Sequence, residues 1–288
     1  MDRLVDKIGY NFKKYISSVV LIYILLSIVL FAGLSFLEKN YLLFVFIFIS
    51  SFFVMTSLVM FLVRMSVTLK DKIKEVHKYD YQNTESLMYI LSMIKIKSPL
   101  PPSRSWAVAP DLVSIIFRRI LDRKPKNIVE LGSGISTQFI CHLIKDHELN
   151  SKLYSIDHSR DFLNLTIRNL QVSDLDNYAE TLYCPLTKHT INQKNWNWYD
   201  IDFENLPKID LLIVDGPVAA ESKYARYPAL PKFSDKLNDN AMIILDDYHR
   251  QDENEIVQRW LKEIDGLKLT EEADTEKGCA VLTFSPGS

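Results

Sequence analysis

Hydrophobic positions along this chain of 288 residues follow two different patterns. Two long apolar runs without a charged residue, 15–37 and 41–63, come first, and only Glu38, Lys39 and Asn40 separate them. Each run exceeds the ~20 apolar residues that a helix needs to cross a bilayer. From about residue 99 onward, short apolar segments alternate with longer segments of helical periodicity. The pattern therefore predicts a membrane anchor followed by an α/β domain.

Basic residues flank both apolar runs, whereas the turn between the runs holds only Lys39. Because basic residues concentrate on the cytoplasmic side of membrane helices, both termini are expected to be cytoplasmic, at the inner or plasma membrane. A cleaved signal peptide is the alternative for the first run, but a signal core spans only ~7–15 apolar residues and a second run follows at once. We therefore expect residues 1–64 to form a multi-pass anchor of two transmembrane helices.

Residues 65–98 alternate charged and apolar positions at roughly helical spacing. This pattern predicts an amphipathic stalk or linker, which lies either against the membrane surface or in solvent. The segment Ser98-Pro-Leu-Pro-Pro102 cannot continue a helix. We therefore place the start of the last domain, 99–288, at this break.

The alternation within 99–288 predicts a Rossmann-like, doubly wound sheet of about seven strands with helices on both faces. Strands are expected at 127–131, 152–156, 180–184, 210–214, 241–245, 267–270 and 279–284. Helices are expected at 109–121, 136–147, 160–172, 221–237 and 252–264, with Pro228 and Pro231 interrupting the fourth. The connection between the last two strands is too short for a helix, so the last strand should be antiparallel.

Charge and cysteine content narrow the classes of function. Lysine and arginine number 34 and aspartate and glutamate 36, a balance that gives no support to a nucleic-acid partner. Cys141, Cys184 and Cys279 are far apart and without paired spacing, which indicates buried, reduced thiols rather than a disulfide framework or a zinc site.

Polar residues gather at the carboxyl ends of the predicted strands, where sheets of this type bind ligands. The first strand runs through Glu130 into the turn Gly132-Ser-Gly134, and Asp157 ends the second. Glycines let the backbone turn sharply and approach a ligand closely. An acid before the turn suits a ligand with a cationic amino-acid end, and Thr137 stands where a dinucleotide-binding fingerprint has its third glycine. These features favour S-adenosylmethionine over NAD.

The domain resembles the class I S-adenosylmethionine-dependent methyltransferases over about two-thirds of the chain. The acid-x-Gly-x-Gly motif of that family is matched by Glu130, Gly132 and Gly134, and its ribose-binding acid by Asp157. Some members also share the runs Trp198-Tyr-Asp200, Val214-Asp-Gly-Pro217, Ala225-Arg-Tyr-Pro-Ala229 and Leu245-Asp-Asp247. The resemblance implies a seven-stranded sheet with an antiparallel last strand. It also implies cofactor contacts from Glu130, Gly132, Ser133, Gly134, Thr137, Asp157 and His158.

Methyl transfer requires an aligned nucleophile and, in some cases, a base. Three carboxylates, Asp215, Asp246 and Asp247, follow the fourth and fifth predicted strands and form an oxygen ligand set suited to Mg²⁺. The alternative is that the last two are a helix cap and a surface acid. The expected catalytic residues are Asp215, Asp247 and His249, the histidine serving as base because its ordinary pKa lies near neutrality.

Further side chains have two interpretations each. Arg226 and Arg250 could meet an anionic acceptor, although most arginines simply lie at the surface. Trp196, Trp198 and Tyr199, in a polar segment, could form a sugar-stacking wall or pack into the core beneath a loop.

Together these patterns predict a membrane-anchored methyltransferase with S-adenosylmethionine and, as a second cofactor, Mg²⁺. The expected reaction is O-methylation of a sugar, a lipid-linked glycan or a lipid head group at the cytoplasmic face. The expected partners are membrane lipids, through the anchor, and an unidentified methyl acceptor. A non-catalytic membrane scaffold that retains the fold is the first alternative. An NAD-dependent oxidoreductase is the second, disfavoured by the missing third glycine and by the acid before the turn.

Overall fold

The computed structural model describes residues 21, 24, 25, 27, 28, 41–96, 108–218 and 220–286. The predicted span 15–37 lies largely outside the described residues, and the proline-rich segment 98–102 lies wholly outside them. The chain divides into two compact units, Met1–Lys78 and Tyr79–Ser288.

Helix α2 (Tyr41–Met93) has 53 residues and contains the second predicted membrane span, 41–63. Its part from Ile47 onward is long and apolar enough to cross a bilayer, with a mean hydropathy of 2.0 over its most apolar window, none of which is buried within the protein. Within the described residues this is the one helix that meets this criterion of length and composition. The predicted pair of transmembrane helices is therefore not shown.

The last turns of α2 belong to the compact unit that begins at Tyr79, earlier in the chain than the boundary predicted at 99. Ile90 is fully buried, and Ile94 beyond the helix end is 5% exposed. The Tyr79 hydroxyl donates to Asp274 Oδ1 at 3.1 Å, and Gln82 Nε2 donates to the Asp274 carbonyl at 2.8 Å. Apolar residues four positions apart lie on one helix face, and this face is covered by the domain rather than by lipid or solvent.

The predicted sheet is confirmed in the described part of the chain, with strands in the order β3-β2-β1-β6-β7-β9-β8. The strands are β1 (Asn127–Leu131), β2 (Lys152–Asp157), β3 (Ala179–Tyr183), β6 (Ile209–Val214), β7 (Leu237–Asp246), β8 (Leu267–Ala273) and β9 (Cys279–Phe284). The pairs β1–β2, β2–β3, β1–β6 and β6–β7 are parallel. Strand β9 runs antiparallel to both β7 and β8, as the short last connection predicted.

Most predicted helices are also present: α3 (Pro110–Arg123), α4 (Ile135–Asp146), α5 (Arg160–Val172) and α7 (Gln251–Glu263). The prediction of a helix over 221–237 is wrong for most of its length. That segment forms turns up to Pro228, then the short α6 (Ala229–Phe233) and a 3₁₀ turn, Ser234–Lys236. Prolines at 228 and 231 supply no backbone donor, which prevents a continuous hydrogen-bond ladder.

A two-stranded hairpin, β4 (Leu186–Ile191) and β5 (Lys194–Tyr199), forms where the sequence analysis placed a polar segment without strands. Both residues of its turn have positive φ, which suits a two-residue hairpin connection. Trp198 and Tyr199 are fully buried, and the Trp196 ring lies 4.5 Å from that of Tyr227. Core packing is therefore the correct interpretation for Trp198 and Tyr199.

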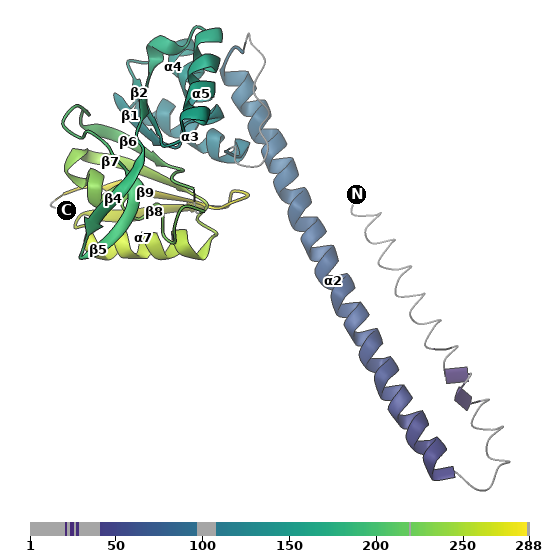
Figure 1. The fold of residues 1–288 in the computed structure, drawn as a ribbon. Coiled ribbons are helices and arrows are strands. Elements are labelled where there is room, and N and C mark those ends of the chain that lie inside the picture. The colour runs from purple at the N-terminus through teal and green to yellow at the C-terminus, as the bar shows by residue number, and fades with distance from the viewer. Residues whose placement is uncertain are drawn as a thin grey trace. The chain divides into compact units, whose positions relative to one another are not determined.

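Helix α7 lies on one side of the sheet and α3, α4 and α5 on the other (Figure 1), and each face of the sheet has its own hydrophobic core. On β6, Leu212 and Val214 pack with α6, α7 and the hairpin, whereas Leu211 and Ile213 pack with α3, α4 and the end of α2. The alternation of side chains along the strand supplies both cores. The three cysteines are buried and unpaired, as predicted: Cys141, Cys184 and Cys279.

Candidate active site

The site lies where the chain order of the sheet reverses, between the carboxyl ends of β1 and β6. Strand β1 pairs with β2 on one side and with β6 on the other. Gly132, directly after β1, has φ +101°, and a Cβ there would lie 3.4 Å from the main chain of Asp215 and Gly216. The backbone angle therefore favours glycine at 132, whereas the contacts of a Cβ with the β6 end would be at ordinary van der Waals distance.

Gly134 differs from Gly132 in what surrounds it. Its φ of −177° is an extended conformation open to any residue, and a Cβ there would meet no atom within 4 Å. Nothing in the described chain therefore requires glycine at 134. The space beside Gly134, at the start of α4, is therefore open. A ligand that contacts the backbone at a helix N-terminus needs such a space.

Glu130 is a fully buried carboxylate held from one side only. Its Oε2 accepts hydrogen bonds from Thr137 Oγ1 at 2.5 Å and from Ser155 Oγ at 2.8 Å. Its Oε1 is buried and has no hydrogen-bond partner among the described residues. Burial raises the pKa of Glu130, opposed by the hydroxyl groups of Ser136, Thr137 and Ser155. A cationic group placed against Oε1 would satisfy this carboxylate.

Asp157, at the end of β2, is 6% exposed and oriented by two backbone donors. Its Oδ2 accepts from Ser133 N at 2.9 Å, and its Oδ1 accepts from Ser159 N at 2.7 Å. The neighbouring His158 places Nδ1 3.5 Å from Asp157 Oδ1 and Nε2 3.7 Å from Glu221 Oε1. Each carboxylate oxygen retains a lone pair, so Asp157 can still accept from two vicinal hydroxyls.

These residues fit S-adenosylmethionine. Glu130 offers a free buried carboxylate oxygen to an ammonium group, and Asp157 offers two oxygens to a ribose. The two acids lie on neighbouring parallel strands, Glu130 within β1 and Asp157 at the end of β2. The predicted cofactor residues lie on β1, β2, the turns that follow them and the first turn of α4: Glu130, Gly132, Ser133, Gly134, Thr137, Asp157 and His158.

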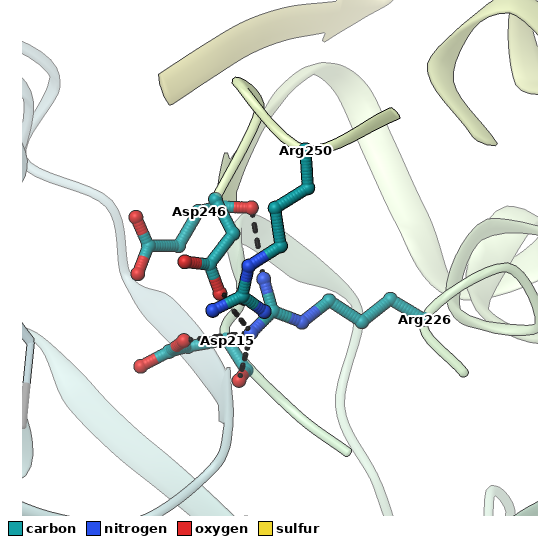
Figure 2. Close-up of polar contacts among 5 residues, drawn as sticks. Asp215, Arg226, Asp246 and Arg250 are labelled. Atoms are coloured by element: carbon teal, nitrogen blue, oxygen red, sulfur yellow. Dashed lines mark hydrogen bonds and ion pairs between the residues drawn. The ribbon is translucent and has the colours of Figure 1, made fainter. Parts of the chain in front are cut away.

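The three predicted metal ligands also come together, at the ends of β6 and β7. Ligand oxygens of Asp215, Asp246 and Asp247 lie within 4.8 Å of one another. The guanidinium of Arg226 reaches into this cluster (Figure 2), with Nη2 3.1 Å from Asp215 Oδ1 and 2.7 Å from Asp247 Oδ2. Arg226 also donates to the carbonyls of Asp215 and Asp246, each at 2.8 Å. A buried cation therefore ties the two strand ends together.

The electrostatics of the cluster follow from its burial. Burial and the neighbouring Asp246 hold the pKa of Asp215 well above its ordinary value. Burial and Asp247 raise the pKa of Asp246. Burial lowers the pKa of Arg226, but the three carboxylates outweigh it, so the net pKa is raised and the side chain stays charged. Arg226 is 3% exposed and its guanidinium is bound to Asp215 and Asp247, so it is not one of the arginines that simply lie at the surface, and its contact with an anionic acceptor stays a prediction.

The cluster fits Mg²⁺ poorly while Arg226 is present. The oxygens Asp215 Oδ1 and Asp247 Oδ2 already accept from its guanidinium, and Asp247 Oδ2 also lies 3.0 Å from Arg250 Nη1. Two unit charges about 4 Å apart repel by ~4 kcal/mol at an effective dielectric of 20, and a divalent ion doubles this cost. The partnerless oxygens, Asp246 Oδ2 and Asp247 Oδ1, are enclosed, whereas Mg²⁺ usually keeps several waters.

The alternative interpretation of the acidic pair is also wrong. Asp246 and Asp247 are 2% and 4% exposed, so neither is a surface acid. Helix α7 begins at Gln251 behind Arg250, and no side chain caps it.

His249, the predicted base, has a different environment. The residue is exposed, and its main-chain N–H donates to the main-chain carbonyl of Lys277 at 3.0 Å. A Cβ on Gly278 would clash with the imidazole ring of His249. It lines an open pocket of about 660 Å³ together with Tyr248 and Glu272. Among the described residues, no hydrogen bond or ion pair joins His249 to the aspartate cluster. Its role as base stays a prediction.

Two further residues lie at the site: Ser155 was not singled out from the sequence, and Tyr199 was considered there only as a sugar-stacking or core residue. Ser155, on β2, supports Glu130. Tyr199 is fully buried, its hydroxyl has no partner among the described residues, and a Cβ on Gly216 would lie 2.3 Å from that oxygen. Burial and the nearby Asp157 raise the pKa of Tyr199, which therefore stays a neutral donor. Its position depends on the hairpin, which the pattern did not predict.

Comparison with known proteins agrees with this geometry. Residues 129–248 match a family model described as a methyltransferase domain. The structure is similar to an O-methyltransferase from Streptomyces achromogenes involved in tomaymycin synthesis, in complex with S-adenosylmethionine. The TM-score is 0.52 and the identity 12%, covering 72% of this chain and 98% of that one. A second similar structure is an O-methyltransferase from Bacillus cereus in complex with S-adenosylhomocysteine. Its TM-score is 0.48 and its identity 12%, covering 71% of this chain and 91% of that one.

No curated protein matches the chain in sequence. At 12% identity, the likeness to the Streptomyces enzyme shows a shared fold. The chain therefore has the fold of a solved S-adenosylmethionine-dependent O-methyltransferase, and its residues 129–248 match a methyltransferase domain.

Proposed function

We propose that this chain is a membrane-anchored, S-adenosylmethionine-dependent O-methyltransferase that acts on a sugar, a lipid-linked glycan or a lipid head group at the cytoplasmic face. The observation that carries the cofactor is the buried Glu130, whose free Oε1 lies at the switch point of the sheet. When bound, S-adenosylmethionine would supply an electrophilic methyl group to an acceptor oxygen and would leave as S-adenosylhomocysteine, while the proton of the acceptor hydroxyl would pass to a base or to solvent.

The residues of the chain have separate roles in this proposal. Glu130 binds the ammonium group of the cofactor, and Asp157 binds its ribose. Asp215 follows the strand beside β1 and has a side chain that is 24% exposed, which suits a contact with the acceptor. An oxygen acceptor agrees with the name of the Streptomyces neighbour, an O-methyltransferase.

The apolar part of α2 supports the membrane location. A helix of this length and hydropathy, with none of its most apolar window buried in the protein, is suited to lipid. The lysines and arginines on both sides of the predicted anchor support a cytoplasmic domain. An acceptor at the membrane surface would then be within reach of the domain, with membrane lipids as the partners of the anchor.

The test of the cofactor is calorimetric titration of the full chain, in detergent micelles, with S-adenosylhomocysteine. Binding at about micromolar affinity is expected, and Glu130→Ala and Asp157→Ala should each weaken it. Glu180→Ala is the matched control, because Glu180 is an exposed acid on the neighbouring β3. Absence of binding by a folded protein would contradict the proposal. Binding without methylation of any membrane sugar or lipid would favour the scaffold alternative.

A further inference from the structure

Arg226 is placed as a component of the acid cluster rather than as a surface residue. Its side chain is 3% exposed and makes four polar contacts with the ends of β6 and β7 (Figure 2). The side chain of Arg250, the second arginine at the cluster, contacts Asp247 and is 46% exposed. Only one of the two arginines is therefore enclosed between the carboxylates.

Asp215 is the most exposed member of the cluster. Its side chain is 24% exposed, whereas that of Asp247 is 5% exposed and Asp246 as a residue is 2% exposed. Arg226 holds Asp215 by Oδ1 and by the main-chain carbonyl. These two contacts fix the direction of the carboxylate, and Oδ2 makes no hydrogen bond to the described residues.

We propose that Arg226 is the resident cation of this site: it stands where a divalent metal would, so the site works without one, and it orients Asp215 for the acceptor hydroxyl through the free Oδ2. The part that concerns the acceptor rests on the proposed function, whereas the exclusion of metal does not. Because Arg226 acts on the acceptor through Asp215, it is a positioning residue. A consequence is that the acceptor needs one hydroxyl facing Asp215 and no second oxygen to complete a metal's coordination shell.

The test is a titration of the full chain, in detergent micelles with S-adenosylhomocysteine present, with Mn²⁺ as the probe and the paramagnetic resonance signal of free Mn²⁺ as the readout. The wild-type protein is expected to show no saturable binding in the millimolar range. Arg226→Met should gain a Mn²⁺ site, because the carboxylates of Asp215 and Asp247 then lose the buried guanidinium between them, and only the exposed Arg250 still contacts Asp247. Arg250→Met is the matched control and should not gain one. Arg226→Lys keeps a cation and should exclude Mn²⁺ like the wild type.

Saturable Mn²⁺ binding to the wild type that Asp246→Asn abolishes would overturn the inference. Failure of a folded Arg226→Met to gain binding would also overturn it. If Arg226→Met does not fold, the wild-type and Arg226→Lys titrations decide. The Mn²⁺ signal does not depend on methyl transfer, so failure to bind S-adenosylhomocysteine would contradict the proposed function and leave the metal result intact.

Discussion

Burial of the Glu130 carboxylate lowers the free energy of unfolding, and this effect can be measured separately from the contribution of Glu130 to cofactor binding. In Glu130→Gln, the amide can keep the hydrogen bonds with Thr137 and Ser155 but carries no charge. Binding of S-adenosylhomocysteine should weaken about tenfold or more, because hydrogen bonds to charged groups contribute ~1.5–3 kcal/mol. The unfolding free energy at neutral pH should not fall. Calorimetry and denaturant unfolding measure the two effects.

The pH dependence of this variant has a definite sign. The pKa of Glu130 is raised above its ordinary value of 4.5, so the folded state holds its proton more tightly than the unfolded state. Its contribution to stability is present below pH 4.5 and is lost as the pH rises through the raised pKa. Glutamine has no such loss. The unfolding free energy of Glu130→Gln relative to wild type should therefore increase above pH 4.5, and a constant difference would contradict a raised pKa.

The two glycines of the first turn should respond differently to alanine. Gly132→Ala places a side chain at φ +101° against the β6 end, so it should lower the unfolding free energy by about 1 kcal/mol or more. Gly134→Ala meets no protein atom and should leave stability unchanged, yet weaken binding of S-adenosylhomocysteine. Thermal unfolding and calorimetry on both variants test the difference. Unchanged affinity in Gly134→Ala would show that the cofactor does not occupy that space.

At the scale of elements, the last turns of α2 should behave as part of the methyltransferase domain. Ile90→Ala should lower the unfolding free energy by about 2–5 kcal/mol, because Ile90 is fully buried against the domain. Met88→Ala, at a side chain 68% exposed on the same helix, should change it by about 0.5 kcal/mol or less. Equal effects of the two variants on denaturant unfolding would contradict this packing.

The hairpin β4–β5 shows why element patterns can mislead. Its sequence is rich in lysine and asparagine, and only one face of β5 is apolar, so the segment looked polar. The fully buried Trp198 packs edge-on against Phe233, with ring centroids 6.0 Å apart. The hairpin is a separate two-stranded sheet that packs against one face of the main sheet through its side chains. The periodicity of a single segment does not reveal such packing.

At the scale of the whole molecule, the apolar part of α2 should decide where the protein is found. The full chain should remain in the membrane fraction after alkaline extraction. A chain that begins at Tyr79 keeps the compact unit and should appear in the soluble fraction with its affinity for S-adenosylhomocysteine intact. Fractionation by centrifugation, with immunodetection and calorimetry, measures both properties. Membrane retention of the shorter chain would show that the domain itself holds the membrane.

The sequence by itself determined the positions along the chain of the seven strands of the main sheet and of most helices, the antiparallel last strand and the turn after β1. These features depend on local periodicity, on glycine and on loop length, which a single stretch of chain expresses. The same local patterns predicted a helix over 221–237, where two prolines and the tertiary contacts of Arg226 imposed turns instead. They also left the roles of Asp215, Asp247 and His249 as predictions.

Only the tertiary structure decided which charges meet. Asp215, Arg226 and Asp247 come from separate segments, and nothing in their spacing indicates that the arginine lies between the carboxylates. The sequence contains three acids suited to a metal, whereas the fold places the guanidinium of Arg226 between two of them. Local patterns fix secondary structure because its hydrogen bonds are short-range along the chain. The electrostatics of a site depend on side chains that the fold brings together from distant positions.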